Sequence, residues 1–371
     1  MTNEQKESVY LSWLASVKMP ADALRKTLTL CNTAENAFRL IICRDESIRQ
    51  ILPPTYLDKL LRSASPEVFS HFGKILSVHG IHAVTFQDPV FPHILQEISD
   101  PVSILFYQGN LSCLSGRTIS MVGARQASYA GLKAARRIAM DLAKEGVSIV
   151  SGFAYGIDAS CHRGCIEGGS PTAAVLGCGL DQNYPADHAE LRKAILNSNG
   201  VLLTEYAPCE KPLAGNFPYR NRIISGLGNA LILMEAKIRS GSLRTVDHAL
   251  SQGREVFVYP GDPSSPHFEG NHLLLREGGH YFTSARDILE DMNWLDKKPR
   301  CVQNSGCDNT AVPLSPEEME IRRLLVPGAL SFDQLADQSG ILPPDLLSLL
   351  TMMQLNGMIE ALPGKKYQIK Q

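Results

Sequence analysis

Six short apolar segments between residues 115 and about 290 restrict the fold of this chain more than any other feature. They read TISMVGA, SIVSGF, TAAVLGCG, VLLTEY, ALILMEA and EVFVYPG, and glycine, serine or polar residues bound each of them. Nearly continuous apolar runs of this length are typical of parallel strands that are covered on both faces. A helical segment at 128–146 separates the first two, with Ser128 as its expected N-cap and Gly146 as its end. The alternation predicts βαβ units and a doubly wound α/β sheet.

The rest of the chain predicts flanking domains. Residues 1–110 form a mostly helical domain, with a small β lead-in at HAVTF and SILFYQG, and residues 111–294 form the sheet domain. Residues 295–312 are polar and aperiodic, as linkers are. Residues 313–371 predict a helix-turn-helix with a two-stranded wing, which is a winged helix. Its second motif helix, containing LLSLLTMMQL, has few side chains that could read bases, so both duplex DNA and protein remain possible partners.

Composition excludes several classes of protein. The net charge of −2 rules out a uniformly basic coat for nucleic acid, so any polyanion site must be local. We expect no signal peptide, because the start of the chain lacks a basic region followed by an apolar one. We also expect no membrane-spanning helix and no membrane insertion, because no segment has the required apolar length. Nine cysteines, an odd number partly placed in apolar runs, indicate a reduced cytoplasmic protein.

Turns that suit an anion follow three of the predicted strands. Gly123 and Arg125 follow the first strand, Gly152 and Gly156 follow the second, and the fifth leads into Lys237, Ser240 and Ser242. Small residues at the start of a helix expose backbone N–H groups to phosphate, and the carboxyl ends of parallel strands share one sheet edge. Glycines that merely close these loops are the alternative, but three such turns together favour a phosphate-bearing ligand.

Familiar cofactor and enzyme motifs are missing. The sequence contains no GxxxxGK[ST], no GxSxG and no GxGxxG after the first strand, which argues against a P-loop, a hydrolase elbow and a dinucleotide cofactor. Cys161 and Cys165, with His162 between them, supply at most three metal ligands. We therefore expect neither a metal nor a cofactor.

Residues 216–227, NFPYRNRIISGL, carry the most specific chemistry. Phe217 and Tyr219 stand beside Arg220, Asn221 and Arg222. Aromatic faces that stack on bases, together with guanidinium groups that hold the backbone, are typical of single-strand binding, although an aromatic packing contact with surface arginines is equally compatible. Basic residues are also concentrated across 213–246, where Glu235 is the only acidic residue facing Arg220, Arg222, Lys237, Arg239 and Arg244.

These motifs resemble the DNA-processing protein A (DprA/Smf) family of bacterial single-stranded DNA binders. The resemblance rests on an ordered set that spans nearly the whole chain: FQDPVFP, VGAR, SGFAYGIDASCH, AAVLGCGLDQNYP, TEY, FPYRNRIISGL, SGSLRT, GREVFVYPG and EGNHLLLREGG. It implies an extended Rossmann-like sheet with a helical domain similar to a sterile alpha motif (SAM) and an optional winged helix. It also implies that homodimers load the RecA recombinase onto single-stranded DNA during natural transformation, with further DNA-processing proteins as possible partners of the winged helix.

The resemblance also implies roles for residues. Arg125 would hold a phosphate, Phe217 would stack on a base, and Arg220, Asn221 and Arg222 would line the pocket. The remaining contacts would come from Gly123, Gly152, Gly156, Lys237, Ser240, Ser242, Arg244 and Asn271. Ala124 stands where serine is usual, Arg244 replaces an aliphatic residue and Gly279 replaces an alanine, and none of these changes removes a group that the pocket needs.

An enzyme is the alternative. Nucleotide phosphoribohydrolases of the lysine decarboxylase-like superfamily carry a PGGxGTxxE motif, and the corresponding stretch here is SGSLRTVD at 240–247. The double glycine is missing, and Asp247 is shorter than the glutamate and displaced. Hydrolysis of a ribosyl bond needs a carboxylate close to that bond, so we expect binding rather than catalysis.

Overall fold

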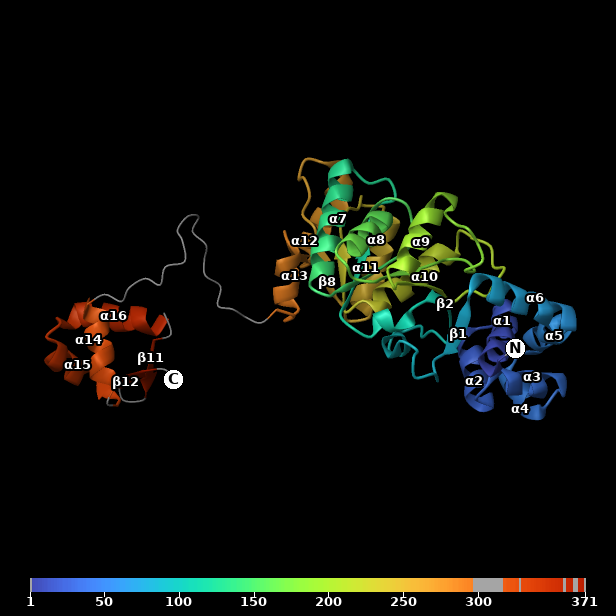
Figure 1. Cartoon of the computed structure of the whole chain (residues 1–371), viewed down its shortest axis with the longest axis horizontal. Helices are drawn as coiled ribbons and strands as arrows, with labels where there is room; N and C mark the ends of the chain where they lie inside the picture. Colours follow the sequence, from blue (N-terminus) through green and yellow to red (C-terminus); the bar gives the residue numbers. More distant parts are fainter. Residues whose placement is uncertain (1, 296–315, 327, 356–357, 363–365, 370–371) are drawn as a thin grey trace. The chain divides into compact units, whose positions relative to one another are not determined.

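The structure is a computed structural model that describes residues 2–295, 316–326, 328–355, 358–362 and 366–369 (Figure 1). The chain divides into two compact units, residues 1–298 and residues 299–371. In the described residues no helix combines the length and the apolar character needed to cross a membrane. The predicted linker 295–312 lies outside the described residues apart from Leu295.

A nine-stranded sheet organises the first unit. The six predicted parallel strands are confirmed as β3 (Thr118–Val122), β4 (Ser148–Ser151), β5 (Thr172–Val175), β6 (Val201–Thr204), β7 (Ala230–Leu233) and β8 (Glu255–Val258). The strand order is β1-β2-β6-β5-β4-β3-β7-β8-β9, where β9 is His280–Tyr281. Successive strands run outward from β3 in one direction up to β6 and in the other from β7. The order therefore reverses between β3 and β7, the position at which doubly wound sheets bind ligands.

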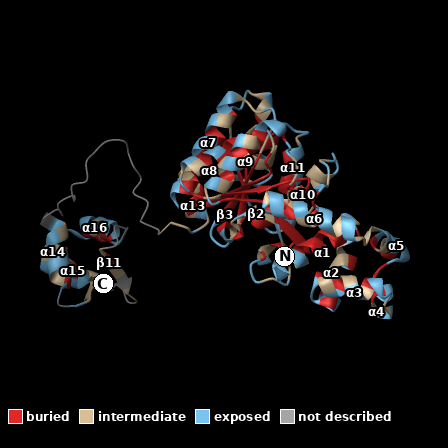
Figure 2. Cartoon of the chain, turned by 45° about the vertical axis from the view of Figure 1, so that its right-hand side comes forward, coloured by how far each residue is buried: buried red, intermediate tan, exposed pale blue. Residues whose placement is uncertain are grey.

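Helices cover both faces of the sheet and bury its strands (Figure 2). One face packs against α7 (Tyr129–Lys144), α8 (Ile157–Glu167), α9 (Ala189–Asn197) and α13 (Ala285–Asp291). The other face packs against α10 (Asn216–Leu227), α11 (Gly241–Ser251) and α12 (Glu269–Arg276). Ser128 caps α7 as predicted, because its side chain accepts a hydrogen bond from the Gly131 N–H. This doubly wound arrangement confirms the predicted fold class.

The N-terminal residues form a helical layer that joins the sheet through two antiparallel strands. Its helices are α1 (Asn3–Ser16), α2 (Ala21–Cys31), α3 (Ala34–Ile42), α4 (Glu46–Ile51), α5 (Pro54–Ser63) and α6 (Pro66–His79). The lead-in forms β1 (His82–Thr85) and β2 (Ile104–Gly109), and β2 pairs with β6. The lead-in is therefore part of the large sheet, and the boundary at residue 110 stays a prediction.

The second unit has the predicted winged-helix elements. They are α14 (Pro316–Leu325), α15 (Phe332–Ser339), α16 (Pro343–Leu355) and the wing strands β11 (Ile359–Leu362) and β12 (Lys366–Ile369). A short strand that the sequence pattern did not indicate, β10 (Leu330–Ser331), pairs with β12. On α16 the exposed side chains include Leu347 and Met352, while Leu346, Leu350 and Met353 are buried in the core of the unit.

Candidate functional site

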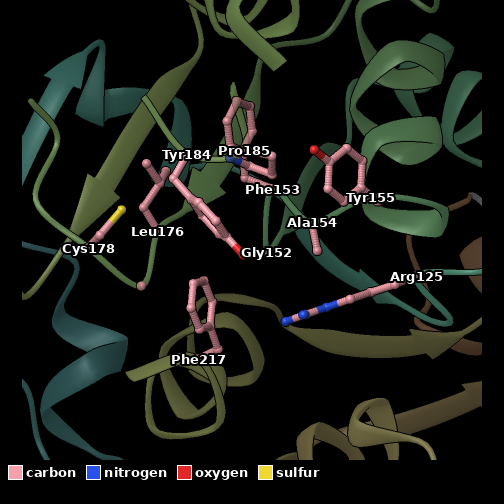
Figure 3. Close-up of a pocket in the computed structure, with 11 residues that line it drawn as sticks. Arg125, Gly152, Phe153, Ala154, Tyr155, Leu176, Cys178, Tyr184, Pro185 and Phe217 are labelled. Carbon is pink, nitrogen blue, oxygen red and sulfur yellow. The ribbon is translucent and has the colours of Figure 1, made fainter. Parts of the chain in front are cut away.

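A narrow pocket lies at the carboxyl ends of β3, β4 and β5, beside the point where the strand order reverses. It contains about 350 Å³ of empty space, open solvent at its mouth included. Figure 3 shows the side chains that converge on it from the loops after these strands and from the start of α10. The lining residues are Arg125, Gly152, Phe153, Ala154, Tyr155, Leu176, Gly177, Cys178, Tyr184, Pro185 and Phe217.

Arg125 and Phe217, predicted from distant parts of the sequence, meet in this pocket. The Arg125 guanidinium carbon lies 5.5 Å from the centre of the Phe217 ring. Arg125 is exposed and Phe217 is half-buried, so a free cation stands over an aromatic ring at the edge of the sheet. This pairing can hold a phosphate and an adjacent flat ring at the same time.

Arg220 lies beneath the pocket and is buried. Its Nη1 donates to the carbonyl of Gly152 at 2.6 Å and to the carbonyl of Val175, which ties α10 to the ends of β4 and β5. Burial lowers the pKa of Arg220 to about 10, although the nearby Asp158 carboxylate opposes this shift. The structure thus places Arg220 next to the pocket as a support for Phe217, with its guanidinium carbon 5.9 Å from that ring.

Close packing explains the glycines that follow β3 and β4. Gly156 has φ +77°, and a Cβ there would lie well inside 3.0 Å of the Ala124 and Arg125 carbonyl oxygens. A Cβ at Gly123 would collide with the Ile157 side chain. These glycines let the turn after β3 rest on the start of α8, which fixes the backbone from which Arg125 projects.

Arg222 faces away from this pocket. Its guanidinium donates to both carboxylate oxygens of Glu205, at 3.0 and 2.6 Å, and to Asp100 at 3.1 Å, while its carbon lies 4.1 Å from the Tyr219 ring centre. Burial alone would lower the pKa of Arg222, but the Glu205 carboxylate outweighs burial and the net shift is upward. Neither Arg222 nor the half-buried Asn221 is among the pocket-lining residues, and their DNA contacts stay predictions.

Some of the predicted residues after β7 lie at a second hollow, with about 880 Å³ of empty space including open solvent. Ser240 and Arg244 line it together with Arg239, and Ser240 caps α11 and contacts the Ser242 hydroxyl at 2.7 Å. Lys237 is exposed at the start of the same loop.

Asn271 is fully buried below this loop. Its Oδ1 accepts from the Ala236 N–H at 2.8 Å, and its Nδ2 donates to the Tyr259 carbonyl at 2.8 Å. The structure therefore places Asn271 as an anchor of the loop that carries Lys237.

A carboxylate of the protein occupies the N-terminus of α7. Glu235, completely buried, accepts from the Ser128 N–H at 2.8 Å and the Ser128 hydroxyl at 2.6 Å, and its Oε1 lies 2.9 Å from His267 Nδ1. The glutamate stands between the serine and the histidine, whereas in a hydrolytic triad the histidine contacts the serine. The anion site that the first strand–helix turn offers is thus filled from within.

Two pocket residues, Tyr155 and Tyr184, were not predicted from the sequence as ligand contacts. Tyr184 lies 5.4 Å from Phe217 between ring centres, and the Tyr155 hydroxyl donates to Asp187 at 3.1 Å. Both follow glycine-containing strand ends, and reading every aromatic residue near those ends would have found them.

No metal site emerges from the part of the chain that the structure describes, because no three His, Cys, Asp or Glu side chains form a suitable group there. Cys161 and Cys165 are buried free thiols, and burial raises the pKa of both. Burial also lowers the pKa of His162 to about 3, so this ring is neutral inside the fold.

Family models match both units of the chain. The model described as DNA recombination-mediator protein A matches residues 82–293, and the DprA winged helix domain matches residues 308–365. Among relatives, Protein Smf of Escherichia coli (strain K12) is 35% identical over 288 residues, which cover 76% of each chain. The DNA processing protein DprA of Streptococcus pneumoniae is 42% identical over 207 residues, covering 56% of this chain and 73% of the relative.

Solved structures agree with these matches. The X-ray structure of DNA processing protein A from Streptococcus pneumoniae has a TM-score of 0.60 and 32% identity, covering 78% of this chain and 99% of the other. DNA processing protein A from Helicobacter pylori, solved to explain its single-stranded DNA binding mode, has a TM-score of 0.51 and 25% identity, covering 57% and 96%.

Proposed function

Because this chain belongs to the DNA recombination-mediator protein A (DprA/Smf) family, we propose that it binds single-stranded DNA in the pocket of Arg125 and Phe217. Its role is DNA processing in recombination, in line with its relatives. The observation that carries the proposal is the exposed Arg125 guanidinium over the Phe217 ring at the carboxyl edge of the sheet. An unpaired strand presents a phosphate and a bare base to such a pair, whereas paired bases hide their faces in the duplex stack.

The path of the strand would continue past the second hollow. Exposed Arg239 and Arg244 line this hollow together with Ser240, and exposed Lys237 lies on the same loop, while Asp247 and Glu277 also line the hollow. Ser242 is buried beside Ser240. Phosphate contacts of this kind are independent of sequence and sensitive to salt. The arrangement suits a protein that holds a short stretch of any single strand.

We propose that the protein binds without catalysis. Asp247, the residue nearest to the glutamate of the phosphoribohydrolase motif, is exposed at the second hollow beside Arg244. Glu235, the buried carboxylate at the sheet edge, is engaged by Ser128 and His267. Neither carboxylate lines the Arg125–Phe217 pocket, and none of the described residues that line it is acidic.

The proposal also covers the oligomeric state, the location, the recombinase and the partner of the winged helix. The protein acts as a homodimer in the cytoplasm, loads RecA onto single strands during natural transformation, and contacts other DNA-processing proteins through its winged helix. Support for the last point comes from α16, whose exposed side chains include Leu347 and Met352 and no Lys or Arg. Base reading in duplex DNA most often uses Arg or Lys, and the polar side chains that α16 exposes include Ser348, Thr351 and Gln354.

Fluorescence anisotropy with a labelled oligo-dT tests the pocket. Arg125→Ala combined with Phe217→Ala should weaken binding at least tenfold, because stacking is worth about 1–3 kcal/mol per base and a phosphate contact is lost as well. Arg137→Ala, which removes an exposed arginine from α7, is the matched control and should leave the affinity unchanged. An unaltered affinity in the double variant would refute the pocket assignment.

RecA loading needs its own assay. The intact protein should speed RecA filament assembly on strands coated by single-strand binding protein, and the pocket variant should not. Equal rates with and without the protein would remove RecA loading from the proposal and leave DNA binding intact.

A further inference from the structure

Of the three aromatic side chains at the mouth of the pocket, Phe217 is the most enclosed. Tyr184 packs at 5.4 Å with the two rings inclined by 46°, and the guanidinium carbons of Arg125 and Arg220 lie 5.5 and 5.9 Å from its centre. A Cβ at Gly177 would be 2.9 Å from the ring. Two rings must stand about 7 Å apart to admit a base between them, since stacked rings are about 3.5 Å apart. Because the Phe217 and Tyr184 rings are closer than that, no second base fits between them.

Tyr155, on the opposite wall of the pocket, combines exposure with rigid support. Tyr155 is 44% exposed, against 38% for Tyr184. The hydroxyl donates to Asp187 at 3.1 Å, and the ring packs edge to face against His188 at 4.8 Å between centres. His188 is itself buried, with Nδ1 3.2 Å from the Phe153 carbonyl oxygen.

This support matters for binding energy. A free surface tyrosine loses rotamer freedom when it stacks on a ligand, whereas a ring already held by its contact with His188 and by its hydroxyl loses little. An exposed aromatic face that is held in place at a ligand pocket is a suitable platform for a flat apolar group. The neighbouring Ala154 and Gly156 add no bulk that could cover it, and Figure 3 shows the Tyr155 ring on the same side of the pocket as Arg125.

We propose that Tyr155 is a second base-stacking residue, so that the pocket binds two neighbouring nucleotides of a single strand. One base lies at the Phe217 wall and the next base stacks on Tyr155, with the Arg125 guanidinium available to the phosphate between them. This inference rests on the proposed single-stranded DNA binding and adds the number of bases that the site takes.

Three substitutions of Tyr155 distinguish the contributions of its aromatic ring, its apolar bulk and its hydroxyl. Tyr155→Ala removes all three properties, Tyr155→Leu keeps only apolar bulk, and Tyr155→Phe keeps the ring but loses the hydrogen bond to Asp187. With the full chain and a short oligo-dT, the Ala and Leu variants should bind about tenfold more weakly, since stacking on one aromatic side chain is worth that order of affinity. The Phe variant should stay within about twofold of the unmodified protein.

A single 2-aminopurine in the oligonucleotide gives a readout that a purely structural role would not change, because its fluorescence is quenched when it stacks on a ring. Quenching should persist with Tyr155→Phe and be relieved with Tyr155→Leu. Equal affinity and equal quenching in all three variants would overturn the proposal, and so would a Phe variant as weak as the Ala variant.

The Arg125→Ala/Phe217→Ala variant keeps the two proposals distinguishable. If it binds as tightly as the unmodified protein, the pocket itself is wrong. If it binds weakly while Tyr155→Ala and Tyr155→Leu bind normally, only the second stacking position is wrong. Thermal unfolding of each variant shows whether a loss of affinity comes from a loss of stability. If Tyr155→Ala is unstable, the affinity of Tyr155→Leu is used to test the second stacking position.

Discussion

Replacing Arg222 by methionine should destabilise the protein far more than it weakens DNA binding. Only 5% of the Arg222 side chain and 15% of the Glu205 side chain are exposed, and two charge-assisted hydrogen bonds join them. Removing one partner of a buried ion pair costs about 3–5 kcal/mol, because the other charge stays buried without compensation. Asp100 is 41% exposed and adds little. We expect a loss of about 3 kcal/mol in the free energy of unfolding.

Urea unfolding followed by far-UV circular dichroism measures this loss, with two companion tests. Combining Arg222→Met with Glu205→Leu should recover at least half of the lost stability, since an apolar pair of similar volume replaces the buried ions. Low pH should also reduce the loss of stability in the Arg222→Met variant. Burial raises the pKa of Glu205 in the folded protein, so without Arg222 the neutral carboxyl is favoured in the fold. That stabilisation is present at low pH and is lost as the pH rises through the raised pKa.

Binding of oligo-dT by the folded Arg222→Met variant should change less than threefold. The structural role would be refuted if this variant unfolded at the same urea concentration as the unmodified protein and yet lost its affinity for DNA. Arg222 would then be a DNA ligand, as the resemblance implies, and the contacts with Glu205 and Asp100 would be incidental.

Further substitutions test other features. Gly156→Ala should lower the melting temperature, since it forces a side chain into φ +77° and against the Ala124 carbonyl, whereas Gly116→Ala, which meets no atom within 4 Å, should not. Stability should fall as the pH drops below about 6.5, because burial lowers the pKa of His162 to about 3 and the unfolded chain takes up a proton that the fold excludes; His162→Gln should flatten that dependence in urea unfolding. Arg125→Ala should reduce the slope of log affinity against log salt concentration by about 0.7 in anisotropy titrations. A chain ending at residue 298 should keep its oligo-dT affinity within twofold, because the pocket lies entirely in the first unit, and a larger loss would place the winged helix on the strand.

The local sequence pattern was sufficient to predict the six parallel strands, because short continuous apolar runs are typical of strands that are buried on both faces of a sheet. It could not show that HAVTF and SILFYQG extend the same sheet, since the pairing of Phe106 with Thr204 joins residues far apart in the chain.

The arginines of α10 show the same limit. Phe217 contacts Arg220, and Tyr219 contacts Arg222, each at a spacing of three residues. Residues three apart are neighbours on a helix surface, so helical geometry could have predicted these two pairs and placed them on different faces. The partner that engages Arg222, Glu205, comes from the end of β6 and has no local signal. Only the three-dimensional arrangement distinguishes the cation at the pocket, Arg125, from those that hold the fold together.

The Glu235 carboxylate at the start of α7 affects which ligands can bind there. In related sheets that place is where the phosphate of a free nucleotide docks, and here a side chain of the protein already fills it. The start of α7 is therefore not a place where free nucleotides and DNA compete, and any competition of dTMP with a labelled strand should depend on Arg125 and Phe217. By supplying its own anion, the fold closes the start of α7 to the phosphate of a ligand.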